Sequence, residues 1–172
     1  MALYAATVEY GLHCLLHLVD APADAKTSAA DLAELQGVSP SYVAKLFTAL
    51  KAAGLVESLE GRHGGYRLAR TAADITVLDV VEALEGDKPL FECKEIRRQC
   101  AVFEGAPPAW AVKGPCSIHA VMLEAEQQMK RSLAGHTLAD LSARVARKAP
   151  KSFALDVDAW LAGRKAARRN PD

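Results

Sequence analysis

The feature that most constrains the fold is a pair of helical segments joined by one glycine and followed at once by two short strands. Residues 29–36 and 40–52 repeat apolar side chains at helical spacing; Gly37 ends the first helix and Ser39-Pro40 supplies a cap and a first-turn proline for the second. Residues 55–59 alternate as a strand, and residues 66–68 return after the glycine-rich turn 61–65. This order predicts a winged helix-turn-helix, whose second helix can enter the major groove of DNA.

The rest of the chain is predicted to be largely helical. Helical periodicity covers residues 6–19, 77–84, 117–134 and 138–147, whereas residues 88–114 show no clear period. We therefore expect a mainly α fold with a small β-hairpin wing. Its divisions are a winged helix-turn-helix domain (1–87), a cysteine-containing loop (88–116), a long helix with a following short helix (117–150) and a C-terminal extension (151–172).

That extension mixes a small apolar cluster with basic residues, and we expect a solvated, disordered end. Its basic side chains could add weak attraction to phosphates. The apolar residues are Phe153, Leu155 and Trp160, and the basic ones include Arg164, Lys165, Arg168 and Arg169.

Composition narrows the functional classes. The 172 residues are 51% hydrophobic, which suffices for one core with a smaller appendage, and no apolar run is long enough to span a membrane. We therefore expect a cytoplasmic protein without a membrane partner, whose four cysteines are thiols or metal ligands rather than structural disulfides. The formal net charge of zero argues against sequence-independent packaging of nucleic acid but not against specific binding through local patches.

Candidate DNA contacts lie on the exposed face of the second helix and in the wing. Hydroxyl and amine groups there can contact phosphates or bases, and the paired glycines of the wing let the backbone approach DNA closely. Arg62 is the favoured contact to the minor groove. The helix residues are Ser39, Ser41, Tyr42 and Lys45, and the wing residues are Arg62, His63, Gly64 and Arg67.

Several segments together resemble a bacterial family of iron-sulfur winged-helix transcriptional regulators, which includes IscR, NsrR and the redox sensor RsrR. The resemblance covers roughly residues 1–138. It rests on the segments Val8-Glu9-Tyr10-Gly11-Leu12-His13, Gly37-Val38-Ser39-Pro40-Ser41-Tyr42-Val43-Ala44-Lys45, Gly61-Arg62-His63-Gly64-Gly65-Tyr66-Arg67-Leu68 and residues 74–86. It implies a homodimer built on the helix 117–134, with each wing reaching half of a palindromic double-stranded operator.

The first helix and the cysteine-containing loop hold the candidate sensor residues. Glu9 and His13 are four residues apart, so both side chains project from one helical face and can reach a single metal. The sequence is most similar to RsrR here, and the likeness implies that the partner's cysteines complete the ligand set for a 2Fe-2S cluster, with Cys93 and Cys116 as the matching positions. Such mixed ligation suits reversible redox sensing.

The remaining cysteines and histidines are weaker candidates. Cys93, Cys100 and Cys116 are unequally spaced, unlike the three close cysteines of many members, and Cys100 is the less favoured ligand. His119, three residues after Cys116, is a substitute ligand, and Cys14 among leucines is expected to be a core residue.

Two alternatives to the iron-sulfur regulator remain open. One is a DNA-binding regulator without metal, in which Cys93, Cys100 or Cys116 senses oxidants directly. The other is a zinc- or cluster-binding adaptor that uses its winged helix for protein contacts. An enzyme is not expected, because the chain shows no catalytic triad arrangement and its Gly64-Gly65 pair lies between strands rather than at a strand-to-helix junction.

Overall fold

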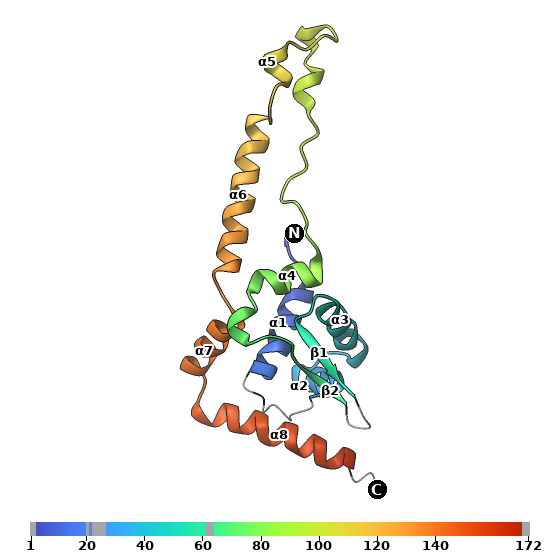
Figure 1. Cartoon of the computed structure of the whole chain (residues 1–172), viewed down its shortest axis with the longest axis vertical. Helices are drawn as coiled ribbons and strands as arrows, with labels where there is room; N and C mark the ends of the chain where they lie inside the picture. Colours follow the sequence, from blue (N-terminus) through green and yellow to red (C-terminus); the bar gives the residue numbers. More distant parts are fainter. Residues whose placement is uncertain (1–2, 20, 22–26, 61–63, 170–172) are drawn as a thin grey trace. The chain divides into compact units, whose positions relative to one another are not determined.

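The fold is mainly helical with one antiparallel hairpin, as predicted (Figure 1). The computed structural model describes residues 3–19, 21, 27–60 and 64–169. Its helices and strands are α1 (Ala6–Val19), α2 (Ala29–Gln36), α3 (Pro40–Ala52), β1 (Val56–Leu59), β2 (Gly65–Leu68), α4 (Val77–Glu85), α5 (Ala109–Val112), α6 (Ser117–Ala134), α7 (Leu138–Lys148) and α8 (Lys151–Arg169), with 3₁₀ turns at Ala72–Asp74, Ile96–Gln99 and Ala101–Phe103.

The chain divides into two compact units. The body comprises residues 1–86 and 134–172, and the cysteine unit comprises residues 87–133. The body holds the helix-turn-helix and hairpin, and the cysteine unit holds α5, α6 and the three cysteines beyond Cys14.

Local sequence signals set the ends of the helices. Ser28 and Asp31 form a reciprocal capping box at the start of α2, and Gly37 ends that helix in the left-handed conformation (φ 66°). Ser39 caps α3 through the backbone N–H of Tyr42. These bonds satisfy N–H groups that have no partner inside the helix, so a tight turn between α2 and α3 follows from a few residues.

The inner faces of the helices form the core of the body. On α3, Val43, Leu46, Phe47 and Leu50 are all buried, as the periodicity predicted. The Phe47 ring packs 4.6 Å, centroid to centroid, from that of Tyr66 on β2. One cluster therefore joins the recognition helix to the wing, because the same aromatic pair belongs to both.

The wing is an antiparallel hairpin in which Val56 pairs with Leu68 and Leu59 pairs with Gly65. Thr27, buried ahead of α2, adds a single bridge to Tyr66 by accepting its backbone N–H at 2.9 Å. The hairpin is thus tied back to the helix-turn-helix at its base.

α1 lies closely against α4 and is contacted by α7. A Cβ at Gly11 would clash with the Leu84 side chain, so glycine at this position allows the two helices to approach. α7 is joined to the start of α4 by two backbone bonds, from Val77 N to His136 O and from Leu138 N to Ile75 O.

The cysteine unit is organised differently. No residue of α6 is buried within the chain. Hydrogen bonds and ion pairs hold this helix where a hydrophobic core would otherwise do so. Glu126 Oε2 accepts the Leu90 N–H at 2.9 Å, and Lys130 pairs with both Glu126 and Asp87. Short helical turns and α5 form within a segment for which the sequence showed no period.

The C-terminal extension differs most from expectation. Residues 151–169 form the helix α8, so the prediction of a disordered basic tail was wrong over residues 164–169. Leu161 of this helix is buried. Arg164 lies over the Trp160 ring and forms an ion pair with Glu34 of α2. Among the described residues, no helix is long and apolar enough to cross a membrane.

Candidate DNA interface and sensor residues

The N-terminal turn of α3 presents polar side chains to solvent. Ser41 and Lys45 are exposed, and their hydroxyl and ammonium groups are available for phosphates or base edges. Ser39 is also exposed, but its Oγ already accepts the Tyr42 N–H at 3.2 Å and lies 3.3 Å from Ser41 Oγ. Ser39 therefore has a structural task as a cap beside any contact it makes with DNA.

Tyr42 faces α1 within the body. Its hydroxyl donates to Thr7 Oγ1 at 3.1 Å, and its ring meets Tyr10 edge-on with centroids 5.7 Å apart. From the sequence, Tyr42 is predicted only as a DNA contact. The contact with α1 was not foreseen because Thr7 lies 35 residues away along the chain.

The wing contributes Gly64 and Arg67 to the described residues. Arg67 is exposed and its Nε donates to Glu57 Oε1 at 2.5 Å across the hairpin, so part of its charge is offset. Arg62 and His63, predicted at the tip, lie outside the described residues.

Glu9 and His13 are both exposed on one face of α1, as their spacing predicted. They border an open groove of about 700 Å³ between α1 and α7. Leu12 and Leu16 line it from α1, with Leu141 and Val145 opposite, and Arg144 and Lys148 add positive charge. A metal or another molecule can therefore reach this pair without unfolding the body.

The four cysteines fall into different environments. Cys14 is fully buried in the body, and burial raises the pKa of its thiol to about 11, which agrees with its prediction as a core residue. Cys100 is exposed, whereas Cys93 and Cys116 are half-buried, and the Cys93 side chain lies near enough to Cys116 to contribute to the lowering of its pKa.

Cys116 stands at the N-terminal end of α6, where its carbonyl accepts the Ala120 N–H at 2.8 Å. The backbone N–H groups of His119 and Ile118 point at its sulfur and lower its pKa, because they stabilise the thiolate. Thiolate is the form that binds metal.

Two neighbours of the cysteines were missed or underrated in the sequence. Glu95 is not predicted as a ligand from the sequence, because nothing in its spacing distinguishes it from other acidic residues. The hydrogen bond from Arg97 lowers the pKa of its carboxyl group. The sequence predicts His119 only as a substitute ligand. Its spacing of three residues from Cys116 at the start of a helix nevertheless places both side chains on one side of that helix. Cys93, Glu95 and His119 bring their ligand atoms within 4.8 Å of one another.

A helix-turn-helix followed by a hairpin, with exposed polar side chains on α3, is the architecture of a winged-helix DNA-binding protein. Comparisons with known proteins agree. The family model Rrf2, described as an iron-dependent transcriptional regulator, matches residues 4–144. The chain belongs to the Rrf2 family of winged-helix transcriptional regulators, which are not enzymes.

Individual relatives span most of the chain. Protein rrf2 of Nitratidesulfovibrio vulgaris (strain Hildenborough) is 39% identical over 83% of this chain and 88% of its own length. YwgB of Bacillus subtilis, described as an HTH-type transcriptional regulator, is 33% identical over 80% of this chain and 83% of its own.

Two solved structures share the fold. IscR of T. potens matches with a TM-score of 0.64 and 26% identity, over 87% of this chain and 92% of that one. CymR, the global cysteine regulator of B. subtilis, matches with a TM-score of 0.64 and 24% identity, over 84% of this chain and 98% of that one. These two structures share the fold with this chain, and the fold alone does not identify the signal that the chain senses.

Proposed function

We propose that this regulator binds its operator as a homodimer, and that an iron-sulfur cluster, of the 2Fe-2S type, switches its affinity for DNA. Glu9 and His13 of one subunit would hold the cluster with Cys93 and Cys116 of the other. When bound, the cluster supplies one-electron redox chemistry, and its presence or absence distinguishes the cluster-loaded regulator from the cluster-free one.

The donor set fits such a group. Two neighbouring, half-buried thiols suit an iron-sulfur cluster, and Cys116 is biased toward thiolate. A carboxylate and an imidazole on one exposed helical face supply the remaining two donors. Cys100 is exposed and is not assigned as a ligand.

The observation that carries the proposal is the link between α1 and the recognition helix. Glu9 and His13 share α1 with Thr7 and Tyr10, and these two residues hold Tyr42 in the first turn of α3. A change in how α1 is held therefore acts on the end of α3 that faces DNA. Such a local change is what a regulatory switch needs if it is to alter operator affinity.

A second copy of the chain is the partner that the α6 surface fits. Ile118, Val121 and Leu123 are exposed on α6, and no residue of this helix is buried within the chain. Large apolar side chains on one helix favour an interface between subunits.

The test begins with anaerobic visible absorption and circular dichroism spectra, with iron and sulfide assays. We expect equal iron and sulfide in the wild type, and loss of both in Glu9→Ala, His13→Ala, Cys93→Ala and Cys116→Ala, with Cys100→Ala as the matched control that keeps them. A wild type without iron and sulfide even after reconstitution would overturn the cluster and leave direct sensing by Cys93, Cys100 or Cys116.

Operator binding then tests the switch. Oxidised and reduced protein should differ in affinity for DNA from upstream of the protein's own gene. Tyr42→Phe, which removes the bond to Thr7 but keeps the ring, should reduce that difference. Thr7→Val should reduce it by a similar amount, and the double variant should add little, because both changes break one bond. Equal binding by oxidised and reduced wild type would refute the switch.

A further inference from the structure

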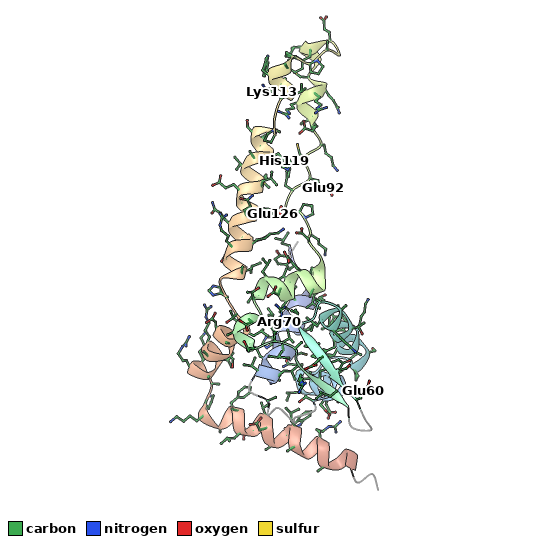
Figure 2. All side chains as sticks on the ribbon, viewed as in Figure 1. Glu60, Arg70, Glu92, Lys113, His119 and Glu126 are labelled. Atoms are coloured by element: carbon green, nitrogen blue, oxygen red, sulfur yellow. The ribbon has the colours of Figure 1, made fainter. Side chains whose placement is uncertain are left out.

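The cysteine unit brings together metal-binding side chains from two segments of one chain. Cys93 and Glu95 precede the first 3₁₀ turn of this unit, and His119 lies in the first turn of α6. The three are half-buried, their ligand atoms all lie within 4.8 Å of one another, and Cys93 Sγ is 3.5 Å from Glu95 Oε1. Figure 2 shows His119 on α6 near the segment of Glu92, and the neighbouring Phe91 ring lies 6.1 Å from its imidazole.

Cys116 supplies a fourth donor beside this set. Cys116 is a neighbour of Cys93, although it lies outside the set of three, and it precedes His119 by three residues, so both project from the start of α6. The cluster therefore holds two sulfur atoms, one imidazole nitrogen and one carboxylate oxygen.

Two arginines hold the Glu95 side chain in place. Arg97 Nε donates to Glu95 Oε2 at 3.0 Å, and Arg98 Nε approaches the same oxygen at 3.4 Å. Oε2 is thus engaged, while Oε1 points to Cys93. Arg97 Nη2 also donates to Gly114 O at 2.6 Å, which ties the segment of Glu95 to the loop leading into Cys116. Hydrogen bonds of this kind to ligating carboxylates typically orient a metal site.

We propose that Cys93, Glu95, Cys116 and His119 form a mononuclear zinc site within a single chain. Zinc takes four ligands from thiolate, imidazole and carboxylate, with bonds of about 2.0 to 2.3 Å, which places donor atoms roughly 3.5 Å apart. The ligand atoms of Cys93, Glu95 and His119 lie within 4.8 Å of one another and need only contract toward this spacing, whereas the Cys116 thiol, which lies outside that set, must move in to complete it. Two thiolates also favour zinc over magnesium or calcium, which prefer oxygen ligands.

The site shares Cys93 and Cys116 with the proposed cluster but needs neither Glu9 nor His13. Zinc and the cluster therefore exclude each other, and zinc loading produces a chain that cannot take up the cluster. Only this competition rests on the proposed function; the zinc site itself does not.

The test uses the full-length chain, reduced and freed of metal with a chelator. Zn²⁺ is titrated against a chromophoric chelator, and Co²⁺ is added separately as a spectroscopic probe. We expect one metal per chain, a tetrahedral Co²⁺ spectrum and thiolate-to-cobalt charge transfer. Cys93→Ser, Cys116→Ser, His119→Ala and Glu95→Ala should each weaken Zn²⁺ binding by at least about tenfold, and Arg97→Gln by about tenfold.

Matched controls carry the same functional groups outside the site. Glu92→Ala, Cys100→Ser and His136→Ala should keep the wild-type affinity for Zn²⁺, and so should Glu9→Ala and His13→Ala. Circular dichroism of each variant establishes that the helices remain folded.

Three results would overturn the inference. They are absence of Zn²⁺ binding, binding that His119→Ala and Glu95→Ala leave unchanged, and binding that His13→Ala abolishes, since this last places the site between subunits. Zn²⁺ binding in a protein that takes up no iron or sulfide defeats only the proposed function. A normal cluster without Zn²⁺ affinity in the cluster-free chain defeats only the zinc site.

Discussion

The body and the cysteine unit are built on different physical principles. Among the described residues, Ala111 is the buried hydrophobic residue of the cysteine unit, and every other one belongs to the body. The cysteine unit is held instead by bonds such as those from Leu90 N to Glu126 and from Arg97 to Gly114. A region without a core of its own gains order from what it binds, which is a suitable property for a sensor.

The largest expected effect is a difference in the free energy of unfolding when one aromatic residue is truncated in each of the two regions. Phe47→Ala removes a fully buried ring that packs on Tyr66, and it should lower the free energy of unfolding by about 3 to 5 kcal/mol in urea titrations. Trp110→Ala in the cysteine unit, where Trp110 is 76% exposed, should change it by less than about 0.5 kcal/mol. Equal losses would show that Trp110 is buried in the assembled protein and would break the comparison.

An intermediate effect is expected in thiol reactivity. Burial raises the pKa of Cys14 from 9.0 to about 11, so its thiolate fraction at pH 8 falls about a hundredfold below that of an ordinary thiol. Iodoacetamide labelling of the native, metal-free chain, followed by mass spectrometry, should modify exposed Cys100 at least about a hundredfold faster than Cys14. Denatured protein is the control, where the two rates should converge. Comparable rates in the native chain would mean that the body opens readily.

The smallest effect concerns the pH dependence of the cysteine unit. The hydrogen bond from the Leu90 N–H, and then Lys130, lower the pKa of Glu126 below its usual 4.5, against the opposing effects of desolvation and, smaller still, of Asp87. Because the folded pKa is the lower one, the stabilisation is complete above pH 4.5 and is lost as the pH falls through the folded pKa. Protection of the Leu90 amide from hydrogen exchange should therefore drop by about two- to fivefold on acidification.

Glu126→Gln should abolish this drop, because the amide does not titrate in this range. Glu124→Gln, on an exposed position of the same helix, is the matched control and should leave it unchanged. A drop of the same size at amides of α3 would show that acid weakens the whole protein rather than the cysteine unit alone.

Much of the fold could be predicted because its signals are local. The caps at Ser28 and Ser39, the left-handed Gly37 and the apolar face of α3 need only near neighbours in sequence. The helix α8 was missed because its apolar and basic residues did not give a clear period. Its pairing with the body depends on Arg164 meeting Glu34, 130 residues earlier in the chain.

The candidate sensor residues were predictable in part. Glu9 and His13 share a face of α1 because four residues make about one helical turn. Glu95 carries no such signal, since its place beside Cys93 and His119 depends on a left-handed backbone conformation (φ 51°) and on Arg97.

By itself, the sequence determined the winged-helix class and the short-range elements, because helix periodicity, capping and glycine turns act over a few residues. Only the tertiary structure decided that Tyr42 contacts α1 through Thr7, and that Cys93, Glu95 and His119 lie together with Cys116 beside them. Such contacts join residues far apart in the chain. They form when packing and hydrogen bonding of whole elements outweigh the entropy of closing the intervening loops, which no local spacing records.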